Sequence, residues 1–280
     1  MLVSHESPID ILDRSKVYND YDYALVHLFE THPEYYNFFK RSLAEGREVL
    51  LDNSIFELGK SFDPKAYAKY IEELKPTFFI VPDVLEDSYA TMSSYHKFTL
   101  NYPDLPGYRI GVVQGKTYAE IVDCYNYMSE HADYIAISFD YSWYDVVALG
   151  SYKLERFCNG RPYLIKRLID DGIWNYNKPH HLLGCSLARE FGYYKRDNIP
   201  GIRSCDTSNP IVAALKGKRY MAGFGLKSKP ATLLADLIDH EVNEDEMEDI
   251  LYNTKEFKII YLVVSLYIAS HPSPGSFSRK

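Results

Sequence analysis

The chain has 280 residues, of which 46% are hydrophobic and 25% are charged, and its formal net charge is -8. This balance is typical of a globular protein that buries a sizeable core, and it excludes an intrinsically disordered or low-complexity chain. The acidic balance also excludes binding of duplex nucleic acid by a uniformly basic surface, so any polynucleotide contact must come from a local patch.

Seven short apolar runs recur along the chain, and longer helical stretches separate most of them. Continuous apolar runs, rather than alternating ones, are typical of parallel strands that are covered on both faces. The strands expected from these runs span residues 23–29, 48–52, 78–83, 109–115, 134–140, 181–186 and 201–206.

Helix signals lie between the expected strands. Asp63 is a good N-cap, and Pro64 suits the first turn of a helix that we expect to run to residue 74. Two further helices are expected over residues 116–130 and 152–171. The apolar run at residues 259–269 is shorter than the ~20 residues that a bilayer span needs, so we expect a buried C-terminal helix there.

The spacing of the strand ends indicates a repeated β-helix-β unit. Asp52 precedes Asp83 by 31 positions, and Asp83 precedes Gln114 by 31, close to the ~30 residues of one such unit. No G-x-G-x-x-G or P-loop motif is present, which disfavours a dinucleotide-binding or P-loop fold. We therefore predict one α/β domain over residues 1–280, a (β/α)8-type TIM barrel. Its core is expected at about 20–225 and a C-terminal helical segment at about 230–270, and an irregular last strand is compatible with this fold.

The cysteines and the N-terminus favour a cytoplasmic protein. The four cysteines are scattered and form no C-x-x-C pair, which predicts reduced thiols and neither a disulfide framework nor a zinc knuckle. The N-terminus has no basic stretch followed by an apolar run, so we expect no signal peptide and no membrane partner.

Polar residues end five of the expected strands, and they are Asp52, Asp83, Gln114, Asp140 and Asp206. Each one alone could cap the next helix or shape a turn. In a barrel, however, the carboxyl ends of all strands meet at one face, where active sites lie. Five such residues at strand ends therefore favour an active site.

Carboxylates in a shared pocket permit glycosyl transfer, because one can attack the anomeric carbon while another moves a proton. A carboxylate beside a carboxamide, here Asp83 and Gln114, suits the donor and acceptor edge of a purine-like base.

Several of these segments resemble motifs of the tRNA-guanine transglycosylases, in the correct order. Leu51–Glu57 is similar to the family's L-D-S-G-x-F-Q motif, and Asp83 stands where the family has its base-binding aspartate. The most specific match is Gly111–Gly115, which resembles G-I-V-Q-G. His181–Gly184 resembles Y-L-M-G, and Cys205–Pro210 resembles the D-x-x-x-P-T region that bears the nucleophile.

The resemblance implies a role for each matching residue. Asp206 would be the nucleophile and Asp52 the general acid and base, while Asp83 and Gln114 would bind a guanine or 7-deazaguanine. The segment 136–139 occupies the place of a glycine-containing base-binding loop but has no glycine, so Ser138 is only a candidate contact. Further candidates for substrate binding are Gly115, Asp140, Gly184 and Phe56.

The chain also departs from the enzymes that act on tRNA. They carry a C-x-C-x-x-C…H zinc cluster after the nucleophile, whereas no cysteine follows Cys205 here, and this chain is shorter. It therefore looks more like the DNA 7-deazaguanine transglycosylases of phages and mobile elements. That likeness implies exchange of guanine in DNA for a 7-deazaguanine such as preQ0, in the host cytoplasm if the protein is phage-encoded. We expect no cofactor and no metal, and we leave a homodimer open.

Three other functions stay open at this point. The same exchange could act on tRNA, and a barrel of this kind could be a metal-dependent hydrolase that uses His27, His180 and Asp206. The chain could also be a non-catalytic barrel that binds nucleic acid. The basic residues that could contact a polynucleotide, or simply be solvated helix ends, are Lys166, Arg167, Lys195, Arg196, Lys216, Lys218, Arg219, Lys227 and Lys229.

Overall fold

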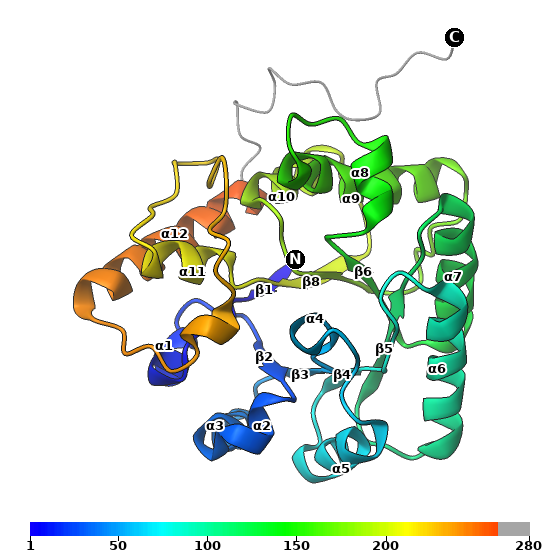
Figure 1. Cartoon of the computed structure of the whole chain (residues 1–280), viewed down its shortest axis with the longest axis horizontal. Helices are drawn as coiled ribbons and strands as arrows, with labels where there is room; N and C mark the ends of the chain where they lie inside the picture. The colour runs from blue at the N-terminus through cyan, green and yellow to red at the C-terminus, as the bar shows by residue number, and fades with distance from the viewer. Residues whose placement is uncertain (263–280) are drawn as a thin grey trace.

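The computed structural model describes residues 1–262, and its centre is a barrel of eight parallel strands surrounded by helices (Figure 1). Around the barrel the sheet order is β1-β8-β7-β6-β5-β4-β3-β2, so neighbouring strands follow one another along the chain. This arrangement confirms the predicted (β/α)8 TIM barrel. The strands are β1 (Leu2–Ser4), β2 (Asp22–Leu25), β3 (Val49–Asp52), β4 (Phe78–Ile80), β5 (Tyr108–Val113), β6 (Tyr134–Ser138), β7 (His180–Leu183) and β8 (Ile202–Asp206).

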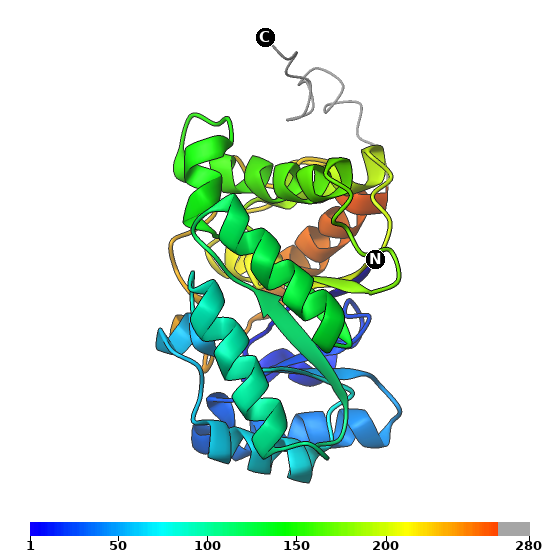
Figure 2. The same ribbon diagram turned by 90° about the vertical axis from the view of Figure 1, so that its right-hand side faces the viewer.

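The longer helices form the outer layer, whereas Figure 1 shows the short α4 inside the ring of strands. Figure 2 shows two of the outer helices, α6 and α7, crossing the outside of the sheet side by side. No helix within residues 1–262 is long and apolar enough to cross a membrane. The helices are α1 (Leu12–Ser15), α2 (Leu28–Thr31), α3 (Pro33–Ala44), α4 (Ile55–Leu58), α5 (Pro64–Leu74), α6 (Ser88–Asn101), α7 (Tyr118–His131), α8 (Ser142–Val147), α9 (Lys153–Asp170), α10 (Phe191–Arg196), α11 (Asn209–Leu215) and α12 (Glu244–Leu262), with short 3-10 turns at Ile9–Ile11, Ala188–Glu190 and Leu234–Leu237.

The three helices predicted between strands are confirmed as α5, α7 and α9, and local capping explains where they begin. The Asp63 carboxylate accepts a hydrogen bond from the Ala66 N–H at the start of α5. At the start of α7, Thr117 and Glu120 form a reciprocal capping box. Of the apolar run at 259–269, residues 259–262 belong to α12, and the rest lies outside the described residues.

One strand was missed. β1 (Leu2–Ser4) lies before the expected start of the core near residue 20, and the run at 23–29 forms the second strand, not the first. Strands are recognised in a sequence from a pattern over about four to eight residues. A run of three residues is too short to show such a pattern. β1 pairs in parallel with β8, placing Ser4 opposite Asp206.

Hydrogen bonds from a loop, in place of a strand ladder, connect β1 to the segment before β2. The Val3 N–H donates to Asp20 Oδ2 and the Asp20 N–H donates to the Val3 carbonyl, both at 2.9 Å. The Asn19 side-chain amide makes two hydrogen bonds to the His5 backbone: it accepts from the N–H at 2.7 Å and donates to the carbonyl at 3.0 Å. These bonds close the barrel between its first two strands.

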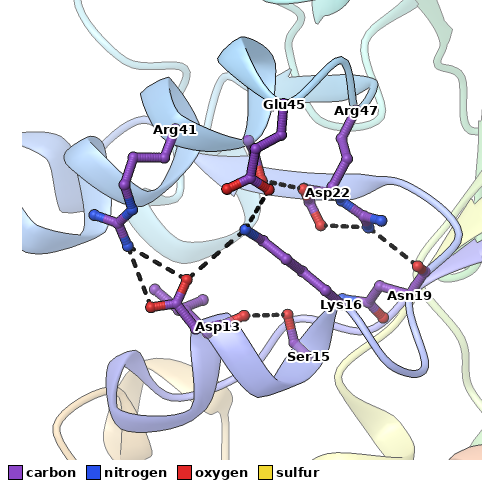
Figure 3. Close-up of polar contacts among 10 residues, drawn as sticks. Asp13, Ser15, Lys16, Asn19, Asp22, Arg41, Glu45 and Arg47 are labelled. Atoms are coloured by element: carbon purple, nitrogen blue, oxygen red, sulfur yellow. Dashed lines mark hydrogen bonds and ion pairs between the residues drawn. The ribbon is translucent and has the colours of Figure 1, made fainter.

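An ion pair between the buried Asp22 and the partly exposed Arg47 fixes the start of β2 beside this loop (Figure 3). The Asp22 side chain, only 2% exposed, accepts from Arg47 Nε at 2.8 Å and Nη2 at 2.9 Å, and Ser42 also donates to it. Arg47 Nη2 donates in addition to the Asn19 carbonyl at 3.1 Å. The same guanidinium therefore ties β2 to the loop that closes the barrel.

We expect Arg47→Met to lower the free energy of unfolding by about 3 kcal/mol, because it leaves the buried Asp22 carboxylate without its charged partner. Urea unfolding followed by circular dichroism measures the effect. Arg41→Met is the matched control, since the Arg41–Asp13 pair is exposed and should contribute less than about 1 kcal/mol. Equal losses in the two variants would contradict the role given to Arg47.

Candidate active site

A cavity of about 200 Å³ opens at the carboxyl ends of the strands. Apolar residues from four strands, Leu25, Ile80, Val112 and Leu183, form part of its lining. The structure brings all but one of the site residues predicted from the sequence to this cavity, and those residues are Asp52, Phe56, Asp83, Gln114, Ser138, Asp140, Gly184 and Asp206.

Gly115 is the exception, because it does not line the cavity and so its expected contact with substrate is not supported. A Cβ atom at this position would lie 2.8 Å from the Ile121 nitrogen and 2.9 Å from Glu120 Cβ. The glycine therefore allows the loop after β5 to approach the first turn of α7 closely.

Asp206, at the end of β8, is held by donors from β7 and the residue that follows it. His181 Nε2 lies 3.0 Å from Asp206 Oδ1, and the Gly184 N–H donates to the same carboxylate at 3.2 and 3.3 Å. His181 Nδ1 lies 2.9 Å from the Ser204 hydroxyl. A proton on Nε2 lets His181 donate to the Asp206 carboxylate and leaves Nδ1 to accept from the Ser204 hydroxyl. These contacts fix the orientation of the Asp206 side chain.

Asp52, at the end of β3, has different surroundings. The Tyr23 hydroxyl donates to Asp52 Oδ2 at 2.6 Å, and the Ser54 N–H donates to Oδ1. Burial, together with the nearby charge of Glu57, raises the pKa of Asp52 well above its ordinary value. Asp52 therefore holds a proton more readily than an exposed aspartate does.

Two further carboxylates, Glu6 and Glu57, line the cavity and were missed by the sequence analysis. Burial and the neighbouring Asp206, Glu57 and Asp52 raise the pKa of Glu6 well above its ordinary value. Burial also raises the pKa of Glu57 to about 7. Glu6 lies just after β1, in the position that the predicted site residues have relative to their own strands. A sequence analysis that recognised β1 would therefore have identified Glu6 as a site residue.

At another part of the cavity wall, Asp83 and Gln114 form a fixed pair. Asp83 accepts from Gln114 Nε2 and from Asn53 Nδ2, each at 2.8 Å. The Glu86 N–H donates to Gln114 Oε1 at 2.9 Å, so the amide nitrogen of Gln114 faces the carboxylate. Together they present acceptor and donor atoms side by side on adjacent strand ends.

Aromatic rings and a glycine form a further part of the wall. The rings of Phe56 and Phe139 lie 5.9 Å apart, and Phe56 is 47% exposed. Gly184 adopts φ +62, and a Cβ atom there would lie 2.5 Å from the Phe139 ring. On the same side, the Ser138 hydroxyl donates to Asp140 Oδ1 at 2.7 Å. Such rings can stack on a planar base.

A buried arginine packs behind the part of the wall that contains Phe139 and Gly184. Arg161, on α9, is fully buried and donates to Glu190 Oε1 at 2.6 Å. Its Nη1 donates to the carbonyls of Ile137 and Leu183 at 3.1 and 2.7 Å, and Nη2 donates to the Gly184 carbonyl at 2.9 Å. One guanidinium thus fixes the ends of β6 and β7 relative to each other.

The four cysteines are free thiols, and all of them are buried. Burial raises the pKa of the Cys185 and Cys205 thiols well above the ordinary value. Because the thiolate is the nucleophilic form, neither cysteine is suited to attack a substrate at neutral pH.

The histidines proposed for a metal site do not meet at the cavity. His180 begins β7, where it stacks on Trp174 with ring centroids 3.7 Å apart, and its Nε2 lies 2.8 Å from the Tyr125 hydroxyl. His27 precedes α2, and neither histidine lines the cavity. Among residues 1–262, no group of three or more His, Cys, Asp or Glu side chains is placed to hold a metal ion.

Fold and cavity together define a TIM-barrel protein with a carboxylate-lined site at the carboxyl ends of its strands. Comparison of the sequence with known family models and with curated proteins finds no match.

The raised pKa of Glu57 predicts how stability depends on pH. Between its ordinary value of 4.5 and about 7, the unfolded chain loses this proton while the folded protein keeps it, so stability falls as the pH rises through that window. In Glu57→Gln the free energy of unfolding should fall by about 1 to 3 kcal/mol less over this pH window than it does in the wild type. Urea unfolding at pH 4.5 and 7.5 tests it, with Glu72→Gln on the exposed side of α5 as control. Identical pH profiles for wild type and Glu57→Gln would be the contrary result.

Proposed function

We propose that the protein exchanges a guanine in a polynucleotide, with DNA favoured, for a 7-deazaguanine such as preQ0. The observation that carries the proposal is that Asp52 and Asp206 line one cavity with different hydrogen-bond partners, close to the Asp83–Gln114 pair. Pairs of carboxyl groups whose surroundings favour opposite protonation states are typical of glycosyl-transfer sites.

In the first step Asp206 acts as the nucleophile. His181 and Gly184 hold its carboxylate by N–H donors, and an oxygen of that group attacks C1′ of the target nucleotide. The bond from C1′ to the base breaks, and its electron pair leaves with the base. The product of this step is an ester between Asp206 and the sugar.

Asp52 moves the proton in both directions. Its raised pKa retains a proton for the ring nitrogen of the departing guanine. The incoming base returns a proton to Asp52 as its ring nitrogen attacks C1′, and the ester bond to Asp206 breaks. Atoms and charge balance over the cycle, and the configuration at C1′ is retained.

Asp83 and Gln114 are proposed to select the base. The carboxylate oxygens of Asp83 can accept from the ring N–H and amino group of a guanine. Gln114 Nε2, whose direction is fixed by the Glu86 N–H, can donate to the carbonyl oxygen of the base. Phe56 and Phe139 provide rings on which the base can stack.

A backbone feature supports the resemblance to the transglycosylase family. Ser54 stands where the family motif L-D-S-G-x-F-Q has glycine, and it adopts φ 58, a left-handed conformation that favours glycine. The turn directly positions Asp52, because the Ser54 N–H donates to its carboxylate. A metal-dependent hydrolase gains no comparable support, since His27 and His180 do not line the cavity.

Incubation of the protein with labelled preQ0 or guanine, and with DNA or separately tRNA, tests the exchange. We expect incorporation, and we expect Asp206→Asn to lower it by about 1,000-fold or more because the ester can no longer form. A covalent adduct of protein and polynucleotide should be detectable after rapid denaturation of the wild type and absent from the variant. Asp123→Asn, at an exposed position of α7, is the matched control.

Folded wild-type protein that incorporates neither base into either polymer would reject the proposal. Incorporation into tRNA alone would favour the tRNA reaction. Tight binding of polymer without turnover would favour a non-catalytic barrel.

Base selection has its own test. Asp83→Asn replaces an acceptor by an N–H donor opposite donors of the base, and we expect guanine affinity to fall about 30- to 100-fold, equivalent to about 2 to 3 kcal/mol. Isothermal titration calorimetry with free guanine measures it, with circular dichroism to verify folding and Asp123→Asn as control. Unchanged affinity would remove Asp83 from the proposed base site.

A further inference from the structure

The cavity presents an electrostatic problem for any polyanionic substrate. Six carboxyl groups line it, those of Glu6, Asp52, Glu57, Asp83, Asp140 and Asp206. A nucleic-acid strand whose base enters this cavity must bring its phosphates close to these groups, and those of them that are ionised repel the phosphates. A cation among the cavity-lining residues would offset this repulsion.

Lys229 is the one cation among the cavity-lining residues in the part of the chain that the structure describes. It belongs to the segment 226–235, called here the cavity loop, of which residues 229–235 all line the cavity. The Tyr152 hydroxyl, at the start of α9, donates to the Lys227 carbonyl and so anchors this loop to the barrel wall.

The Lys229 ammonium has spare donor capacity. It donates to the Cys185 carbonyl at 3.3 Å and lies 4.7 Å from the centroid of the Phe139 ring. An ammonium carries three N–H donors, so this contact leaves room for an anionic oxygen. Burial lowers the pKa of Lys229, whereas Asp140 and Glu6 oppose that shift, and a bound phosphate would oppose it further.

Several arginines and lysines of the other candidate basic patches form ion pairs elsewhere on the protein. Arg219 pairs with Glu248 and Asp249 on α12, and Arg196 pairs with Asp197. The remaining patch, Lys166 and Arg167, lies near the end of α9, on the face of the barrel opposite the active site. Both residues pair with carboxylates, Lys166 with Asp170 and Arg167 with Asp171.

We propose that Lys229, assisted by the exposed Lys227, binds a backbone phosphate of the polynucleotide whose base enters the cavity. The inference rests on the proposed function, because it takes a nucleic-acid strand as the substrate. The cavity loop would thus hold the strand while Phe139, next to the ammonium, and Phe56 receive the base.

Salt-dependent binding tests the inference without requiring exchange. Fluorescence anisotropy with a guanine-containing single-stranded DNA, and separately with tRNA, gives the slope of log K against log salt from 50 to 200 mM. We expect Lys229→Met to weaken binding several-fold at low salt and to reduce the slope by about 0.7 to 0.9, the value of one phosphate contact. Lys229→Arg should retain most of the slope, and free-guanine affinity should be unchanged in both variants.

Lys166→Met, on the opposite face, is the matched control and should keep the wild-type slope. An unchanged slope in Lys229→Met would overturn the inference, even if exchange proceeds and the proposed function stands. A reduced slope in a protein that exchanges no base would support the phosphate contact while the proposed function fails. Absence of polymer binding by the wild type would overturn both.

Discussion

Closure of a parallel sheet is the constraint on which the rest of this structure depends. Parallel strands that follow one another around a barrel end at a single rim, so residues that are far apart in the chain meet there. Closure requires β1 to be held between β8 and the loop before β2, and hydrogen bonds from Asn19 and Asp20 hold it on the loop side. Ser4 is thereby placed opposite Asp206, and Glu6 reaches the cavity.

Because the strand ends converge, several carboxyl groups lie close together in one cavity. The structure reduces their mutual repulsion in two ways. Some carboxyl groups, such as Asp52, Glu6 and Glu57, favour their protonated forms because burial and mutual repulsion raise their pKa values. Others are stabilised by donors, as Asp206 is by His181 and Gly184. The carboxyl groups of this one cavity therefore differ in their hydrogen-bond partners and in how readily they hold a proton.

A buried arginine connects the strand ends that carry part of this cavity. Arg161 donates to backbone carbonyls at the ends of β6 and β7 and is paired with the buried Glu190. A buried pair of this kind adds little net stability, since desolvation offsets most of its attraction, but removal of either partner is costly. Its contribution here is geometric: Gly184, whose N–H binds Asp206, is held by the Arg161 bond to its own carbonyl.

The sequence by itself determined the repeating pattern, the barrel and the strand-end residues Asp52, Asp83, Gln114 and Asp206, because apolar runs and their spacing are local properties of the chain. It did not reveal β1 or Glu6, since a three-residue strand becomes recognisable only through its neighbours. Only the tertiary structure decided that His181 orients Asp206, that Gly115 serves helix packing, and that Lys229 faces the cavity. Those roles depend on contacts between segments brought together by closure, and sequence spacing does not encode such contacts.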